Sequence, residues 1–549
     1  MLKLKAVRPE WVTLFASAFL LTGFNFVLWQ HLFDITTADG KGIAMRIAFG
    51  VMIFAAYNIV LTLLAFRPVL KPVLTLLFMV SAGVAYFMSQ YGVMIDAGMF
   101  RNFAETNATE VRDLLSLKLL AYIVFLGVLP SWLLWKVPVN YRRWHRELLS
   151  KVVVSVASVA VIGGVALANY QGLSSLFRNH HEIRLMLVPS NYIGASAGYL
   201  REQVASVHQP FVTIGEDAQR NAAVQNHPRK SLTVLVVGES ARAENFGILG
   251  YGRDTTPKLD KEAGLIAFTD VHSCGTETAV SVPCMFSNMG RKDYDASKAK
   301  NEEGLLDVLK RAGIDVIWRD NQSGCKGTCD RVTLQDVSNL KDPALCANNE
   351  CRDEILLQGL QSFIDHLDKD TVLVLHQMGS HGPEYFKRYP KEYEHFTPVC
   401  ESNALNNCSR ESILNGYDNT LVYTDHVLSS LIDVLRSNQD KVDTAMLYLS
   451  DHGESLGEYN LFLHGTPYML APEQQKHVAM LAWFSDSYQK SYSVDTHCLQ
   501  MSRDKPLSQD NLFHSMLGLL EVQSKVYQPD LDMFAGCRGA VIDGVLAKD

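Results

Sequence analysis

The sequence predicts a protein of two parts: an α-helical transmembrane domain of five spans, followed by an exported α/β domain with a mostly parallel sheet. Two observations predict this fold class. Apolar residues crowd into the first third of the 549 residues, whereas all ten cysteines lie at Cys274 or later. From residue 231 onward, short β-branched runs alternate with helical stretches. We therefore expect a transmembrane domain at 1–173, an interfacial bridging helix and linker at 174–230, and the exported domain at 231–549.

Five apolar stretches are long enough to cross a bilayer, which needs roughly 17–25 residues. They lie near 11–29, 47–66, 72–89, 119–135 and 152–170. The first has no small-residue cleavage site and four more stretches follow it, so we expect it to remain as a span and not to be removed as a signal peptide.

Positive charge predicts the orientation of these spans. Lysine and arginine cluster before the first span, between the second and third, and between the fourth and fifth. The residues are Lys3, Lys5, Arg8, Arg67, Lys71, Lys136, Arg142, Arg143, Arg146 and Lys151. Such regions stay in the cytoplasm, so an odd number of spans exports everything after about residue 171. The loop at 91–117 is then exported as well.

The cysteines favour the same placement, because an even number at short spacings is typical of a disulfide framework in an oxidising compartment. The expected pairs are Cys274 with Cys284, Cys325 with Cys329, Cys346 with Cys351, Cys400 with Cys408, and Cys498 with Cys537. Free thiols or a zinc cluster are the alternative. The segment Cys-Lys-Gly-Thr-Cys lacks the two-residue spacing of zinc knuckles.

Two segments near the membrane carry polar residues in suggestive positions. In the 91–117 loop, Asn102, Thr106 and Glu110 lie four residues apart, which puts them on one face of a helix. By itself, this pattern is more typical of a solvated face than of a binding site.

In the bridge, polar side chains lie among apolar residues, as in an interfacial amphipathic helix. They are Arg178, His180, His181 and Arg184.

In the exported domain, three runs suit buried parallel strands: 232–237, 371–375 and 444–449. Helical stretches near 302–312, 354–367 and 411–436 fall between them. Sites in such sheets form beyond the carboxyl ends of the strands.

Carboxylates and an imidazole follow the ends of two of these predicted strands. Glu239 follows the first run, and Asp451 and His452 follow the third. These side chains are zinc ligands in catalytic sites. Adjacent Asp451 and His452 can reach one metal from a turn, which the following Gly453 favours.

A small-polar segment between Cys274 and Cys284 offers candidate nucleophiles. Thr276, Thr278 and Ser281 are all possible on chemical grounds, because a hydroxyl at a helix start lies where backbone N–H groups favour phosphate. A bound zinc would lower the pKa of such a hydroxyl. The alternative is that these residues only cap a helix.

Five motifs together resemble the lipid A phosphoethanolamine transferases of the alkaline phosphatase superfamily, over nearly the whole chain. They are Val-Gly-Glu-Ser-Ala-Arg (237–242), Thr-Glu-Thr-Ala-Val-Ser-Val-Pro-Cys (276–284), Gly-Ser-His-Gly-Pro (379–383), Tyr-Leu-Ser-Asp-His-Gly-Glu-Ser-Leu-Gly-Glu (448–458) and His-Gly-Thr-Pro-Tyr (464–468). The resemblance implies an alkaline-phosphatase and sulfatase-like sandwich, with the region at 231–549 as the periplasmic catalytic domain of a bacterial inner-membrane protein.

The resemblance also implies roles for particular residues. Thr278 would be the nucleophile, one zinc ion would be held tightly, and a second would join during turnover. The implied zinc ligands are Glu239, Thr278, Asp451 and His452. His381 and His464 would line the same site, as substrate contacts, proton donors or ligands of the second ion. Lys326 would hold the substrate, and Asn102, Thr106 and Glu110 would bind the lipid donor.

The activity that the resemblance implies is transfer of phosphoethanolamine from phosphatidylethanolamine to a phosphate of lipid A, through a phosphothreonine, in a monomer in the bilayer. Polymyxin resistance would follow. The alternatives are another surface acceptor, glycerophosphate transfer, or a non-catalytic membrane sensor. A sulfatase would need an arginine that 281–285 lacks. The net charge of -8 and the absence of a dominant basic face argue against nucleic acid as a partner.

Overall fold

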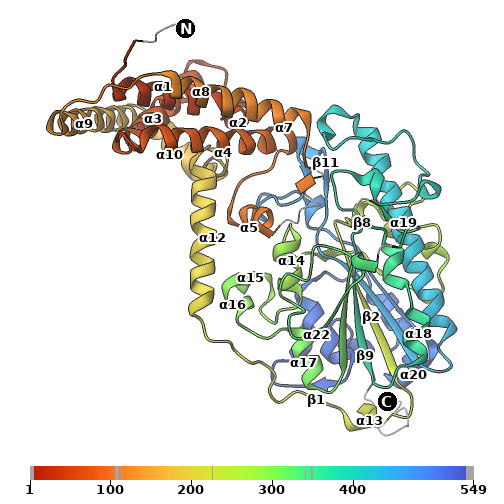
Figure 1. The fold of residues 1–549 in the computed structure, drawn as a ribbon. Helices are drawn as coiled ribbons and strands as arrows, with labels where there is room; N and C mark the ends of the chain where they lie inside the picture. Colours follow the sequence, from red (N-terminus) through yellow and green to blue (C-terminus); the bar gives the residue numbers. More distant parts are fainter. Residues whose placement is uncertain are drawn as a thin grey trace. The chain divides into compact units, whose positions relative to one another are not determined.

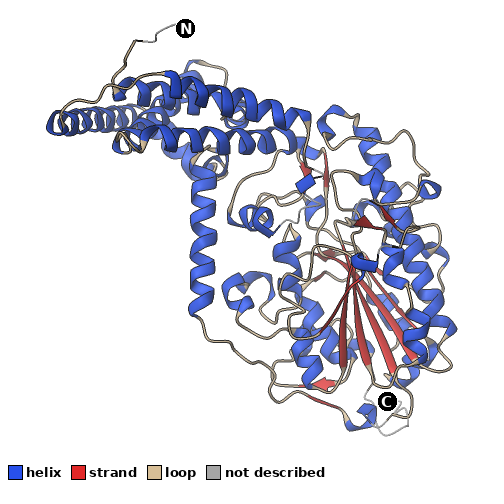
Figure 2. Cartoon of the chain, in the orientation of Figure 1, coloured by secondary structure: helices blue, strands red, loops and turns tan. Residues whose placement is uncertain are grey.

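The computed structural model describes residues 5–105, 111–112, 114–225, 227–340, 342–347 and 350–539 (Figures 1 and 2). Its chain forms two compact units. The first comprises Met1–Phe100 and Leu115–Ala197, and the second comprises Arg101–Leu114 and Gly198–Asp549.

Four helices in the described part of the first unit are long and apolar enough to cross a membrane, and they confirm four predicted spans. They are α3 (Gly40–Leu63), α4 (Leu70–Tyr91), the continuous helix Leu117–Lys136 and α9 (Trp144–Ala168). The continuous helix consists of α7 (Leu117–Tyr122), the π-helical stretch η1 (Ile123–Val128) and α8 (Leu129–Lys136). Pro130 follows the π-helical stretch, and the wider turn fits a residue that has no N–H to donate.

The first predicted span, 11–29, is not one straight helix. It consists of α1 (Pro9–Gly23) and α2 (Phe26–Ile35), which are bent by 62°. The physical reason lies at the break, where the side chain of Asn25 bonds to another part of the unit. Its amide donates to the carbonyl of Val188 (2.9 Å), and its Oδ1 accepts from the N–H of Val188 (2.9 Å). The first predicted span therefore corresponds to a bent pair of helices, and the described part of the unit has five spans if this pair counts as one.

The bridge and the 91–117 loop both contain helices in their described parts. The bridge contains α10 (Tyr170–Asn179), α11 (Ile183–Met186) and α12 (Ser190–His208). The loop contains α5 (Ala97–Glu105), which carries Asn102. Thr106 and Glu110 lie outside the described residues.

The second unit is built on a seven-stranded sheet in the order β3-β13-β10-β2-β9-β5-β6. Neighbouring strands are parallel from β10 to β6, and β13 runs antiparallel to both β10 and β3. The strands are β3 (Ile266–Phe268), β13 (Met480–Phe484), β10 (Asp443–Ser450), β2 (Ser231–Gly238), β9 (Thr371–His376), β5 (Asp315–Asp320) and β6 (Thr333–Asp336). The predicted mostly parallel sheet is thus confirmed.

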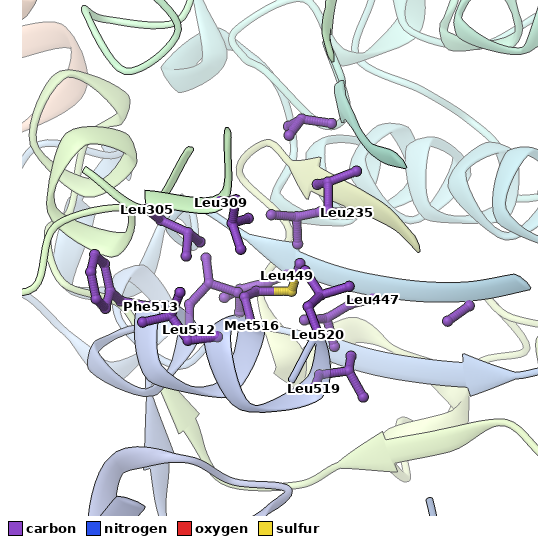
Figure 3. Packing of buried hydrophobic residues seen from close by; sticks show 14 of the residues in the cluster. Leu235, Leu305, Leu309, Leu447, Leu449, Leu512, Phe513, Met516, Leu519 and Leu520 are labelled. Atoms are coloured by element: carbon purple, nitrogen blue, oxygen red, sulfur yellow. The ribbon is translucent and has the colours of Figure 1, made fainter. Parts of the chain in front are cut away.

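Alternate side chains of the central strands pack on opposite faces of the sheet, as a strand buried on both faces requires. On β2, Leu235 and Val237 face one core and Val234 and Val236 face the other. Figure 3 shows the first core, where Leu235 and β10 residues meet Leu512 and Met516. Helices α17 (Leu305–Arg311) and α22 (Asp510–Leu519) supply that face. Helices α19 (Arg410–Ser437) and α18 (Leu360–Asp365) cover the other.

The helix predicted at 354–367 is broken, whereas those at 302–312 and 411–436 correspond to α17 and α19. A 3₁₀ turn, η6 (Asp353–Leu357), precedes α18, and Gly359 lies between them with φ 69°. A left-handed residue interrupts an α-helix, and glycine adopts that conformation at little cost.

All five predicted cysteine pairs are bonded in the structure. They are Cys274–Cys284, Cys325–Cys329, Cys346–Cys351, Cys400–Cys408 and Cys498–Cys537.

Candidate active site

The site lies at the carboxyl edge of the sheet, where β2 and β10 end side by side. The two strands are paired up to Gly238 and Ser450, and the N–H of Asp451 donates to the carbonyl of Gly238 (2.9 Å). Glu239 and Asp451 follow directly, and both carboxylates are fully buried. Parallel register therefore brings together two side chains that lie 212 positions apart in the sequence.

Thr278 is the first residue of helix α14 (Thr278–Met285), and its hydroxyl contacts both strand ends. Oγ1 donates to Oε2 of Glu239 (2.9 Å) and lies 3.2 Å from Nε2 of His452. The other two candidate nucleophiles have different partners. The hydroxyl of Thr276 donates to the carbonyl of Thr466 (2.7 Å), and Oγ of Ser281 accepts from the N–H of Gly275 (3.0 Å). The structure thus distinguishes Thr278 from the alternatives that the sequence left open.

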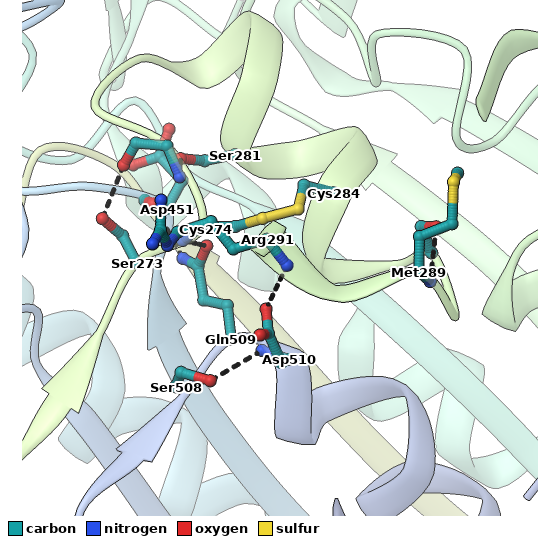
Figure 4. The surroundings of a disulfide bond; sticks show 12 residues. Ser273, Cys274, Ser281, Cys284, Met289, Arg291, Asp451, Ser508, Gln509 and Asp510 are labelled. Atoms are coloured by element: carbon teal, nitrogen blue, oxygen red, sulfur yellow. Dashed lines mark hydrogen bonds between the residues drawn. A yellow bond between two sulfur atoms is a disulfide. The ribbon is translucent and has the colours of Figure 1, made fainter. Parts of the chain in front are cut away.

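A buried glutamine ties the segment before Thr278 to the end of β10 (Figure 4). Oε1 of Gln509 accepts from the N–H of Cys274 (2.7 Å). Its Nε2 donates to the carbonyls of Ser450 (2.8 Å) and Asp451 (2.7 Å). The disulfide from Cys274 to Cys284 closes the same segment, so α14 is held at both ends.

The chemistry of these residues fits a bound divalent cation. Ligand atoms of Glu239, His452 and His464 all lie within 4.8 Å of one another. Nε2 of His452 also lies 3.4 Å from Oδ2 of Asp451, a buried oxygen that accepts no hydrogen bond from any described residue. Two adjacent buried carboxylates are costly unless a cation compensates them. Carboxylate oxygens and imidazole nitrogens are the ligand set of catalytic zinc.

The two carboxyl groups differ in their electrostatic surroundings. Burial and the neighbouring charge of Glu239 raise the pKa of Asp451 well above its usual value. Burial acts to raise the pKa of Glu239, but its interactions with the rings of His452, His381 and His464 and the hydrogen bond from Ser240 outweigh burial and leave this pKa below its usual value. Glu239 is therefore the ionised partner of the Thr278 hydroxyl.

The pKa values of the His452 and His464 imidazoles are also shifted in opposite directions. Burial and the charge of His464 lower the pKa of His452 to about 3, so that its ring stays neutral and can act as a ligand. Burial disfavours the charged form of His464, but the Glu454 carboxylate overcomes this effect and raises its pKa to about 9. Nδ1 of His464 lies 2.8 Å from Oε2 of Glu454. His464 thus carries a proton at neutral pH.

The remaining predicted residues lie at different places. The ring of His381 packs against that of His464 with centroids 5.7 Å apart. Nζ of Lys326 donates to Oγ of Ser323 (2.9 Å). Lys326 also lines a cavity of about 440 Å³ together with Ala279, the residue after Thr278. The donor-binding role of Asn102 on α5 stays a prediction.

Three residues that support Glu239 and His464 escaped the sequence analysis. Nε2 of Gln322 donates to Oε2 of Glu239 (2.9 Å), and Oγ of Ser240 donates to its Oε1 (2.7 Å). Glu454 orients His464. The sequence could have identified Glu454, because it lies in the same motif as Asp451. Gln322 follows β5, a strand that the sequence analysis did not identify.

Gly379 supplies a test of how closely the loop after β9 fits against Glu239. It has φ 52°, and an added Cβ would lie 2.7 Å from the carbonyl oxygen of Glu239. We expect Gly379→Ala to displace Glu239 and to lower both zinc affinity and melting temperature. The measurement is zinc titration with thermal unfolding of the full-length protein.

Gly313→Ala is the matched control for this substitution. Gly313 also has positive φ (89°), but an added Cβ there would meet nothing within 4 Å. Gly313→Ala should be destabilised only by the conformational cost of roughly 1–2 kcal/mol, and its zinc affinity should be unchanged. Equal zinc affinities in the two variants would contradict the assigned contact.

The fold and the site define a membrane-anchored enzyme of the alkaline phosphatase superfamily. A sequence profile of the sulfatase family matches residues 231–522, and a profile described as phosphoethanolamine transferase EptA/EptB matches residues 53–204. The chain belongs to the EptA and Mcr family of phosphoethanolamine transferases.

Two curated relatives and one solved structure illustrate the similarity. The phosphoethanolamine transferase EptA of Escherichia coli K12 is 43% identical, over 98% of this chain and 99% of its own. The phosphatidylethanolamine transferase Mcr-1 of Escherichia coli is 38% identical, over 94% and 96%. The lipooligosaccharide phosphoethanolamine transferase A of Neisseria meningitidis superimposes with a TM-score of 0.94 at 36% identity, over 97% of this chain and 100% of its own.

Proposed function

We propose that this protein transfers phosphoethanolamine from phosphatidylethanolamine to a phosphate of lipid A, through a phosphoethanolamine ester on Thr278. The observation that carries the proposal is the position of the Thr278 hydroxyl. It lies at the start of α14, within hydrogen-bonding reach of Glu239 and His452 at the carboxyl edge of the sheet. Membership of the phosphoethanolamine transferase family indicates which group is transferred.

The first half-reaction is an attack of Oγ1 of Thr278 on the phosphorus of the donor. The hydroxyl is oriented by the ionised carboxylate of Glu239, which Gln322 and Ser240 hold in place. The bond between phosphorus and the diacylglycerol oxygen breaks as the bond to Oγ1 forms, and the hydroxyl proton of Thr278 passes to the carboxylate of Glu239, which accepts its hydrogen bond. The first turn of α14 presents backbone N–H groups, which favour the phosphoryl oxygens.

The departing diacylglycerol oxygen needs a proton, and His464 is suited to give it. His464 is protonated at neutral pH because of Glu454, and it lies next to His452 with ring centroids 4.3 Å apart. In the second half-reaction, a phosphate oxygen of lipid A attacks the same phosphorus, and the leaving oxygen of Thr278 takes back its proton from Glu239. His381, beside His464, is the second candidate for proton transfer in this scheme.

Zinc is the cofactor that we propose, held by Glu239, Thr278, Asp451 and His452. His381, and His464 once it has given up its proton, would be available to a second ion. When bound, zinc would lower the pKa of the threonine hydroxyl and neutralise charge on the transferring phosphoryl group. Support comes from the unpaired Oδ2 of Asp451 and from the ligand set itself.

Donor binding is proposed for Lys326, Asn102, Thr106 and Glu110. Lys326 lines the cavity next to the start of α14, where its ammonium could contact a phosphate. Glu110 is the natural partner for the ammonium of ethanolamine. We further propose that the N-terminus is cytoplasmic and the catalytic unit periplasmic, and that the chain acts as a monomer.

The product has an additional amine on lipid A, so the outer surface becomes less anionic. Weaker binding of cationic peptides, polymyxins included, should follow because these peptides depend on electrostatic attraction.

Mass spectrometry of lipid A tests the proposal. Cells that express the protein should show lipid A species heavier by one phosphoethanolamine, and cells without it should lack them. A mass addition of glycerophosphate would favour that alternative reaction. If lipid A is unmodified and another surface glycan has the added phosphoethanolamine, that glycan is the acceptor. The proposed chemistry at Thr278 would then be unaffected.

A further inference from the structure

A second group of metal-binding side chains lies in the first unit, outside the candidate active site. It consists of His31 on α2 and of His180 and Glu182 in the segment between α10 and α11. Nε2 of His31 lies 3.0 Å from Oε1 of Glu182, and Nδ1 of His180 lies 2.8 Å from the same oxygen. Both imidazoles are thus aimed at one point, although 149 positions separate them in the sequence.

These distances are close to those within a metal coordination sphere. Zinc binds imidazole nitrogen and carboxylate oxygen at about 2.0–2.2 Å in tetrahedral geometry, so its ligand atoms lie roughly 3.3 Å apart. The three ligand atoms here already lie within 4.8 Å of one another. Small side-chain rotations would therefore admit an ion between His31, His180 and Glu182.

The ligands are also held in place and remain reachable from solvent. Asn25, just before α2, binds the backbone of Val188, and the hydroxyl of Tyr57 donates to the carbonyl of Val188 (2.6 Å). These bonds fix the segment after Glu182 against the start of α2. The side chains of His31 and His180 are 25% and 31% exposed, so an ion has access.

We propose that His31, His180 and Glu182 form a binding site for a divalent transition-metal ion of the zinc class. Two imidazoles and one carboxylate leave a fourth position for water, and this ligand set prefers such ions over Mg²⁺ or Ca²⁺. The ion would cross-link α2 to the bridge. This site is independent of the proposed catalytic chemistry.

The test counts zinc ions in the tag-free, full-length protein in detergent. After chelation and equilibrium dialysis against micromolar Zn²⁺, elemental mass spectrometry gives the zinc equivalents per chain. His31→Ala and His180→Ala should each bind one equivalent fewer than the natural protein. This difference does not depend on how many ions the active site holds.

His181→Ala is the matched control, because His181 is an exposed neighbour outside the group. It should retain the full number of equivalents. Unchanged zinc content in both His31→Ala and His180→Ala would overturn the proposal and leave a hydrogen-bonded cluster only.

A second measurement does not depend on the folding of variants. Crystals of the natural protein grown with Zn²⁺ should show anomalous scattering at the zinc edge between Nε2 of His31 and Nδ1 of His180. A map with zinc at the active site and none at this position would also overturn the proposal.

Discussion

Thr278→Ala should reduce lipid A modification by on the order of 10³-fold or more, because removal of a nucleophile disables the whole reaction and not one contact. The methyl group of alanine fits where the threonine side chain lies, so the fold should stay intact. The measurement compares phosphoethanolamine transfer in cells that express equal amounts of each protein, with melting temperature as the check on folding.

Thr278→Ser is the matched control for the nucleophile. Serine keeps the hydroxyl near Glu239 and His452, so it should retain a measurable part of the activity. If Thr278→Ala modifies lipid A at the natural rate, another group is the nucleophile.

Asp451→Asn should abolish zinc binding at the active site and transfer with it. Asparagine has the shape of aspartate but lacks its charge, so the change acts on the metal more than on packing. We expect zinc affinity to fall by more than the roughly 10–100-fold that loss of an outer-shell partner costs. The measurement is zinc titration of the full-length protein together with thermal unfolding.

Chelation provides the internal comparison for this prediction. A ligand present at about 1,000 times its Kd stabilises the folded state by about 4 kcal/mol, and removal of active-site zinc should lower the melting temperature accordingly. In Asp451→Asn, chelation should not cause the part of this fall in melting temperature that comes from active-site zinc. Asp425→Asn is the control, because Asp425 is also buried but accepts from the N–H groups of Lys258 and Leu259. Loss of active-site zinc from Asp425→Asn as well would mean that the effect is not local.

The central strands, and the position of the candidate site residues at their ends, were predictable because local patterns encode them. β2, β9 and β10 are continuous apolar runs, and Glu239 and Asp451 follow two of them directly. Parallel register alone then places these two carboxylates side by side. Residue chemistry alone does not distinguish the candidate nucleophiles, because Thr276, Thr278 and Ser281 all lie near the same helix start. Their different hydrogen-bond partners are tertiary features.

The features that the sequence analysis missed depend on contacts between distant segments. The bend between α1 and α2 accompanies bonds from Asn25 to Val188, which no local pattern predicts. β5 ends in Arg319 and Asp320, so it does not look like a buried run. Gln322 at its end therefore went unnoticed as a partner of Glu239.

The most direct test of the central claim is a search for the phosphoethanolamine ester on Thr278. The full-length protein, loaded with zinc, is incubated with phosphatidylethanolamine vesicles in the absence of lipid A and then denatured in acid. Peptide mass spectrometry should find one phosphoethanolamine on the peptide that contains Thr278, and addition of lipid A before denaturation should remove it. Transfer to lipid A that proceeds with no adduct on Thr278, or with the adduct on another residue, would contradict the account.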